Sequence, residues 1–152
     1  MDLPKQIIEL VPTTEARTTL LAEIDALIKS AYQTEGSFDK TLESGVRSEV
    51  KTVISAVAKQ DQTPKQKEAT LTSLRDAVLA LPLLHMTLAF EPSARGIAAF
   101  SEKARSYFGP DVVLDIVVDP ALFGGAQISY NGRYTDLSLA AKMETYFAKE
   151  HR

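Results

Sequence analysis

The sequence predicts an α+β fold, in which a bundle of three to four helices over residues 1–81 precedes a small β-α-β-β-α module over residues 82–152. In the first part, apolar residues recur at steps of three and four, as they do along one face of a helix. After Pro82 they alternate with polar residues, which is typical of a half-buried strand. Turn signals at Asp119-Pro120 and Asn131-Gly132 then divide the second part into short elements.

Two long amphipathic helices are expected first. One begins at Thr13 or Thr14 and runs to about Gln33, with a continuous apolar face. The other extends over residues 38–57 and passes through Gly45, although glycine costs ~1 kcal/mol against alanine in a helix interior. A close approach by a neighbouring helix is one reason to keep a glycine there.

The third long helix has the clearest start signal in the chain. Thr63 suits the N-cap, Pro64 the first helical position and Gln66 the reciprocal position of a capping box. Pro82 ends this helix. A further short helix over residues 3–10 is possible before the first long one.

The second part is predicted to contain strands separated by a helix. We expect strands at residues 84–88, 112–118 and 126–130, and a short return strand over residues 133–135. Ser93 caps a helix between the first two strands, and Gly109 ends it. The strand at 112–118 is β-branched on both of its faces, so we expect both faces to be covered.

The segment after that strand reads as a tight structural corner. Asp119 and Pro120 stop the strand, Leu122 supplies an apolar anchor, and the pair Gly124-Gly125 permits backbone angles that other residues avoid. The glycine pair lacks the spacing and the lysine of a phosphate-binding loop, so a structural bend is the preferred interpretation.

The end of the chain predicts a hairpin and a final helix. Asn131-Gly132 is the strongest short hairpin signal. Asp136 and Ser138 stand at the start of the final helix, and Asp136 is expected to cap it. The apolar face of this helix is formed by Leu139, Met143, Tyr146 and Phe147.

Five residues on two helices are candidates for a surface that binds a partner protein, because aromatic anchors are enriched in interfaces. They are Tyr107, Phe108, Met143, Tyr146 and Phe147. The alternative is that these apolar side chains belong to the core, as the apolar faces of most amphipathic helices do.

Composition argues for a folded domain and against several functions. The chain has 152 residues, 45% of them hydrophobic, and a net charge of −3, which gives no basic stripe for nucleic acid. It has no cysteine, which excludes disulfides and fits a reducing compartment. The longest apolar run, over residues 77–84, is far shorter than the ~20 residues that span a bilayer, so membrane contact is expected only through partners.

No catalytic, cofactor or metal site is predicted. Asp115 and Asp119 are four residues apart on a strand, but Asp119 precedes proline and better suits a turn. The chain has two histidines, His85 and His151, and no nucleophile elbow supports a Ser-His-Asp triad. A small enzyme or ligand-binding domain would instead need a deep pocket with convergent polar side chains, and none is expected.

The order of strand, turn and cap residues in the second part resembles that of the C-terminal domain of the delta subunit of rotary ATP synthases. The mitochondrial counterpart of this subunit is the oligomycin-sensitivity-conferring protein. The resemblance covers about residues 82–147. The segments that match the family are, in chain order, Ala89-Phe90-Glu91-Pro92-Ser93, Phe108-Gly109, Val112-Val113-Leu114, Val118-Asp119-Pro120-Ala121-Leu122-Phe123-Gly124-Gly125, Gly132, Asp136-x-Ser138 and Lys142-Met143. Delta subunits begin with a larger helical bundle than residues 1–81 have room for, which implies a shortened one.

The resemblance implies a non-catalytic stator subunit without cofactors. It would link the b-type peripheral stalk subunit, through the C-terminal module, to the alpha subunits of the catalytic head. The protein would be cytoplasmic and attached to the inner face of the plasma membrane through the complex. The alternative is a free-standing helical adaptor that carries a delta-like module.

Overall fold

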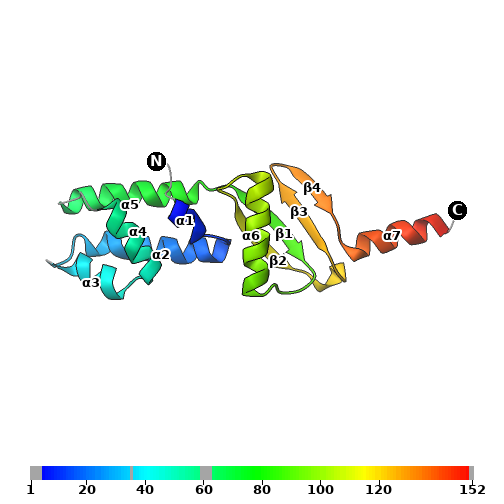
Figure 1. Cartoon of the computed structure of the whole chain (residues 1–152), viewed down its shortest axis with the longest axis horizontal. Coiled ribbons are helices and arrows are strands. Elements are labelled where there is room, and N and C mark those ends of the chain that lie inside the picture. The colour runs from blue at the N-terminus through cyan, green and yellow to red at the C-terminus, as the bar shows by residue number, and fades with distance from the viewer. Residues whose placement is uncertain (1–4, 35, 59–62, 151–152) are drawn as a thin grey trace. The chain divides into compact units, whose positions relative to one another are not determined.

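The computed structural model describes residues 5–34, 36–58 and 63–150, and it has the α+β composition that the sequence predicts. The described residues form seven α-helices, one short 3-10 helix and one four-stranded sheet (Figure 1). The chain divides into two compact units. The first contains residues 1–11 and 15–81, and the second contains residues 12–14 and 82–152.

The first unit is entirely helical. Its helices are α1 (Lys5–Glu9), α2 (Thr14–Ser30), α3 (Ser37–Ser44), α4 (Ser48–Val57) and α5 (Pro64–Leu79). Their apolar faces meet in a core of fully or almost fully buried side chains. These are Ile7, Val11, Leu20, Ile24, Leu27, Phe38, Val50, Val53, Ile54, Leu71, Leu74 and Val78. The unit therefore has five described helices, where the sequence predicted three to four.

The extra helix arises because the predicted helix over residues 38–57 is two helices. α3 ends at Ser44, and the N–H of Gly45 donates to the carbonyl of Thr41 at 2.8 Å. A Cβ on Gly45 would lie 2.8 Å from that same oxygen, so the glycine relieves crowding within its own turn rather than contact with a neighbouring helix. The prediction of one continuous helix was wrong because a glycine of low helix propensity stands at this point.

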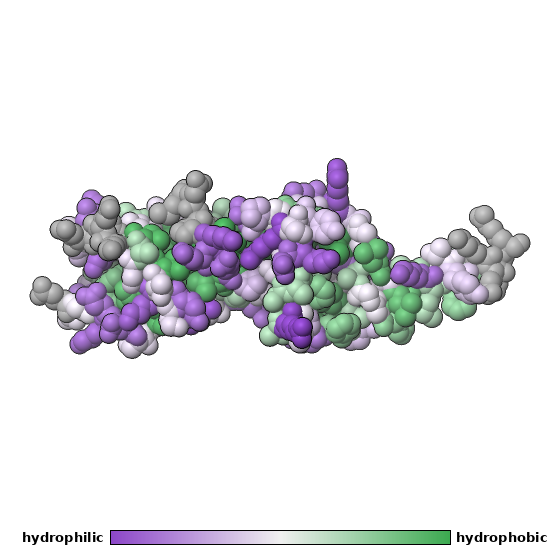
Figure 2. Space-filling view, viewed as in Figure 1, coloured by the Kyte–Doolittle hydropathy of each residue, from purple (hydrophilic) through white to green (hydrophobic). Residues whose placement is uncertain are grey.

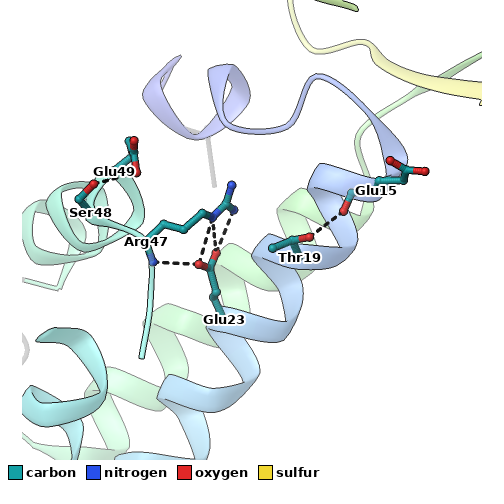
Figure 3. A network of polar contacts seen from close by, with 6 residues as sticks. All are labelled: Glu15, Thr19, Glu23, Arg47, Ser48 and Glu49. Carbon is teal, nitrogen blue, oxygen red and sulfur yellow. Dashed lines mark hydrogen bonds and ion pairs between the residues drawn. The ribbon is translucent and has the colours of Figure 1, made fainter. Parts of the chain in front are cut away.

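An ion pair fixes the new junction. The backbone N–H of Arg47 donates to the Glu23 carboxylate of α2 at 2.9 Å, and the guanidinium binds both carboxylate oxygens at 2.9–3.2 Å (Figure 3). Arg47 is also the N-cap residue of α4. The hydrogen bonds that its guanidinium donates to Glu23 raise the pKa of Arg47 above its ordinary value. One carboxylate of α2 thus sets where α4 begins.

The predicted start of α5 is confirmed. Thr63 accepts a hydrogen bond from the N–H of Gln66, and the Gln66 side chain accepts one from the N–H of Thr63 at 3.0 Å. Pro64 occupies the first turn, where its missing N–H costs no hydrogen bond.

The second unit is a four-stranded mixed sheet with a helix on one face. Its strands are β1 (Leu83–Leu88), β2 (Val113–Val118), β3 (Ala126–Tyr130) and β4 (Arg133–Asp136), in the order β2-β1-β3-β4. β1 and β2 are parallel, and the other neighbours are antiparallel. The parallel connection contains α6 (Ala94–Phe108), with Ser93 accepting from the N–H of Gly96 as the N-cap, as predicted.

The core of this unit lies between α6 and the sheet (Figure 1). Its buried members are Leu84, Met86, Leu88, Ala104, Val112 and Leu114, with Phe100, Ile116, Ala126, Ile128 and Tyr130 packed against them. The opposite face is covered only in part. On β2, Val113 is fully buried but Val117 is 56% exposed, so the expectation that both faces of this strand are covered holds only for its first half.

One edge of the sheet is extended by a segment distant in sequence. Thr13 forms a parallel bridge with Leu114, and the N–H of Leu114 donates to the carbonyl of Pro12 at 3.0 Å. Thr14 Oγ1 donates to Asp115 at 3.3 Å. Residues 12–14 therefore belong to the second unit, which periodicity could not indicate because the pairing involves only one bridge.

Candidate functional site

The corner after β2 is held by its own backbone and by one carboxylate. Asp119 Oδ1 accepts a hydrogen bond from the N–H of Ala121 at 2.9 Å, and Pro120 begins the 3-10 helix η1 (Pro120–Leu122). Leu122 is 5% exposed and anchors the corner. Phe123 follows with a φ of 59° and is 72% exposed. No sequence pattern marks Phe123, because a large residue with positive φ has no sequence signature.

The two glycines of the corner differ in what they do. Gly125 has a φ of 76°, and a Cβ there would overlap the carbonyl oxygen of Leu137 and lie 3.2 Å from the Cα of Ser138. At Gly124 a Cβ would meet Leu139 at an ordinary 3.7 Å. Gly125 is thus required for the chain to bring the segment before the last helix against the corner, whereas Gly124 leaves room for a side chain.

The last helix, α7 (Leu139–Glu150), is joined to the corner by backbone hydrogen bonds. The N–H of Leu139 donates to the carbonyl of Gly124, and that of Leu137 donates to Ala126, both at 2.9 Å. The corner and the beginning of α7 therefore form one assembly at the same end of the sheet (Figure 1).

Ser138, and not Asp136, caps this helix. The Ser138 hydroxyl accepts from the N–H of Ala141 at 3.2 Å, and Asp136 Oδ1 accepts from the N–H of Ser138 at 2.9 Å. Hydrogen bonds from the Ser138 hydroxyl and N–H lower the pKa of Asp136 below its ordinary value. Asp136 also accepts from Gln127 and Tyr134, so it joins the hairpin to the cap. The predicted Asp136 cap was wrong by two residues because β4 continues to Asp136.

The hairpin turn lies at the opposite end of the sheet. Asn131 and Gly132 have φ of 49° and 76°, which a type I′ turn requires, and Tyr130 pairs with Arg133 across it. The end of α6 packs beside this turn: the rings of Phe108 and Tyr130 are 4.8 Å apart, and the Tyr130 hydroxyl donates to the carbonyl of Phe108 at 3.4 Å.

The five candidate partner-binding residues therefore fall into two groups. Tyr107 and Phe108 lie at the hairpin end, because β2 begins soon after them and β3 ends beside them. Met143, Tyr146 and Phe147 lie on α7, which leaves from the corner at the other end. From the sequence these residues were candidates for one surface, but the sheet separates the two groups.

The α7 stripe, as we call Leu139, Met143, Tyr146 and Phe147, is exposed. The exposed fractions are 46%, 43%, 60% and 52%, and the rings of Tyr146 and Phe147 meet edge to face at 5.9 Å. Residues 142–148 are exposed on every side of the helix. Figure 2 shows apolar side chains gathered around the beginning of α7. The stripe has the spacing of a helix face that binds another helix.

The described residues offer no obvious reaction centre. No group of three or more potential metal ligands occurs among them. His85 and Asp115 face each other across β1 and β2, with Nδ1 2.7 Å from the carboxylate, and Thr14 binds the other oxygen of Asp115. Both side chains of this pair are partly exposed, so it resembles a surface ion pair more than a catalytic dyad.

The second unit thus combines an exposed helical stripe with a corner that backbone hydrogen bonds join to the start of α7. Comparison with known families gives this module its context. A model of the family described as ATP synthase delta (OSCP) subunit matches residues 7–148. No curated protein matches the chain.

The chain therefore belongs to the ATP synthase delta (OSCP) subunit family. Members are non-catalytic subunits of the ATP synthase peripheral stalk, or stator, and associate peripherally with the membrane-bound complex. The match begins at residue 7, so the helical first unit belongs to the family as well as the second. None of the helices in the described ranges has the length and apolar character to cross a bilayer.

Proposed function

We propose that this chain joins a b-type stalk subunit to the alpha subunits of the catalytic head, with residues 82–152 binding the stalk and residues 1–81 binding the head. The α7 stripe is the observation that carries the proposal. Four large apolar side chains on one helix face are each at least 43% exposed. An isolated helix of this length is marginal in water, so burial of the stripe by a partner helix would stabilise it.

The corner supports this role because it holds α7 in place. Gly125 lets the chain approach closely, and Ser138 and Asp136 fix where the helix begins. A stator must resist the torque of the rotor, so it needs interfaces that dissociate slowly and an attachment that does not yield locally. The complex would hold the chain at the inner face of the plasma membrane.

Contact with the head is assigned to the first unit. That unit has an open cleft between the end of α2, α3 and the start of α5, with a volume of about 440 Å³. Phe38 lies in its wall with the Lys67 ammonium 4.3 Å from the ring centroid. A helix end from an alpha subunit is the proposed occupant of this cleft.

Binding to a purified soluble fragment of the b-type subunit tests the stalk contact. We expect the double variant Met143→Ser/Phe147→Ser to lose binding by about 100-fold, because two anchors of the stripe become polar. The matched control is Glu144→Ser/Ala148→Ser, which places the same two serines on another face of α7 and should bind as the wild type does. Equal loss in both variants, or binding that neither changes, would overturn the assignment.

A further inference from the structure

The strand β4 forms a free edge of the sheet. Among the described residues its neighbour in the sheet is β3 alone, and in Figure 1 no other element of the second unit lies along its outer side. The turn pairs Tyr130 with Arg133, so the backbones of Arg133 and Thr135 face β3 while those of Tyr134 and Asp136 face outward. No described residue accepts a hydrogen bond from the N–H of Tyr134 or Asp136. This edge can therefore pair with another strand.

A groove runs beside that edge, on the face of the sheet that carries α6. Its cavity has a volume of about 630 Å³. It is lined by Tyr107, Phe108, Ile128, Tyr130, Asn131, Arg133 and Thr135, a set that we call the hairpin groove. Tyr107 is 78% exposed and Phe108 is 40% exposed, so the aromatic wall is open to solvent. The Phe108–Tyr130 contact keeps that wall against β3.

Arg133 supplies the only charge among the lining residues of the hairpin groove. It forms no ion pair with a residue that the structure describes. An arginine that forms no ion pair with the described residues, in the wall of a groove with aromatic lining, favours a ligand that brings a carboxylate, because guanidinium and carboxylate groups match in geometry and charge.

We propose that the β4 edge and the hairpin groove bind an extended segment of a partner protein, which adds a fifth strand to the sheet. One apolar side chain of the segment enters the groove between Tyr107 and Tyr130, and an acidic side chain on the same face of the added strand pairs with Arg133. The backbone bonds to Tyr134 and Asp136 give affinity, and the two side-chain positions give specificity. This interface is additional to the α7 stripe, and its groove lies at the hairpin end of the strands.

The test uses the full chain carrying Met143→Ser/Phe147→Ser, so that the α7 stripe cannot select ligands. Random 12-residue peptides displayed on phage are selected on it, and the enriched peptides are synthesised. We expect an acidic residue two positions from an apolar one. We also expect amide exchange at Tyr134 and Asp136 to slow on binding. Enrichment of no peptide, or of peptides without that pattern, would overturn the proposal.

Substitution of Tyr134 separates strand addition from other ways of filling the groove. Tyr134→Pro removes an N–H that points away from β3, and proline is tolerated on an edge strand. We expect it to weaken peptide binding about tenfold or more, whereas Tyr134→Phe, which keeps the N–H, should bind normally. Because a folding defect in the proline variant would also weaken binding, the peptide is N-methylated at alternate positions in parallel. If neither change affects binding, no strand is added.

A charge exchange tests the role of Arg133. Arg133→Glu should abolish binding of the acidic peptide, and replacing the acidic residue of the peptide by lysine should restore it. Failure of the exchange to restore binding would remove the carboxylate from the proposal. Binding of the b-type fragment through α7 should be unchanged in every Arg133 and Tyr134 variant, so failure of this inference is distinguishable from failure of the proposed function.

Discussion

Gly125 and Gly124 are adjacent in sequence but differ in their surroundings, which makes them a matched pair. Gly125→Ala places a Cβ on a residue with a φ of 76° and against the Leu137 carbonyl. We expect a loss of about 2–3 kcal/mol in the free energy of unfolding, because a left-handed alanine costs roughly 1–2 kcal/mol before the overlap is counted. Gly124→Ala should cost clearly less, since its Cβ meets only Leu139 at 3.7 Å. Urea denaturation of both variants measures the difference, and equal losses would contradict the geometry.

The carboxylate of Asp136 gives stability that depends on pH. Its pKa is lowered, chiefly by hydrogen bonds from the Ser138 hydroxyl and N–H. A group whose folded pKa lies below its unfolded value stabilises the fold fully above the unfolded value, about 3.9 for aspartate, and this contribution disappears as the pH falls through the folded pKa. The wild type should therefore be more stable than Asp136→Asn at neutral pH, and the two should converge in strong acid.

Thermal unfolding followed from pH 7 downward measures that convergence, and an NMR titration of the Asp136 carboxyl checks the direction of the pKa shift directly. A constant difference between the two proteins across this range would show that the effect of the substitution is not due to ionisation. Asparagine is the informative replacement because it keeps an acceptor for the N–H of Ser138 and removes the charge, although its NH2 group replaces the oxygen that accepts from Gln127 and Tyr134.

At the scale of elements, the boundaries that the sequence predicted well have local causes. Thr63 and Gln66 make both bonds of a capping box, and Asn131-Gly132 makes the turn whose angles few other residues adopt. The boundaries that it missed depend on partners distant in the chain. α4 begins where Glu23 holds Arg47, and no local pattern marks that carboxylate.

The same distinction applies to the candidate binding surfaces. The spacing of the α7 stripe was visible in sequence, since it lies within one helix. The hairpin groove combines α6, β3 and β4, and its unpaired arginine becomes notable only once β4 is known to be an edge. The prediction of one aromatic surface from Tyr107, Phe108, Tyr146 and Phe147 failed, because the type of a side chain does not reveal which end of a sheet its helix reaches.

The junction of α2 with α4 offers a test of that long-range control. The Glu23 side chain is 11% exposed and accepts several bonds from Arg47, so Glu23→Ala should cost about 1.5–3 kcal/mol, as expected for hydrogen bonds to charged groups. The control is Glu43→Ala, which removes the bond between Glu43 and Lys51; the Glu43 side chain is 70% exposed. That variant should lose less than about 0.5 kcal/mol. Chemical denaturation compares them, and similar losses would show that burial does not strengthen the Glu23 contact.

At the scale of the whole molecule, the segment between α1 and α2 extends one edge of the sheet of the second unit. Residues 12–14 pair with β2 at Leu114 only, and they cannot pair further because α2 begins at Thr14. The rest of that edge, including the outward N–H of Ile116, has no hydrogen-bond acceptor among the described residues. The chain thus passes between its two units three times, once on each side of residues 12–14 and again at Pro82.

Amide hydrogen exchange can show whether the pairing of residues 12–14 with β2 persists in solution. The N–H groups of Leu114 and Ile116 both point away from β1. Within the described ranges only that of Leu114 has an acceptor, the carbonyl of Pro12 at 3.0 Å. We expect Leu114 to exchange at least about tenfold more slowly than Ile116, because exchange of a bonded amide requires a local opening. Val113, which donates to Pro82 on the β1 side at 2.9 Å, is the internal reference for a paired amide of the same strand. If Leu114 exchanged as fast as Ile116 while Val113 stayed protected, residues 12–14 would be detached from the sheet, and the two units would be joined only through the connection at Pro82.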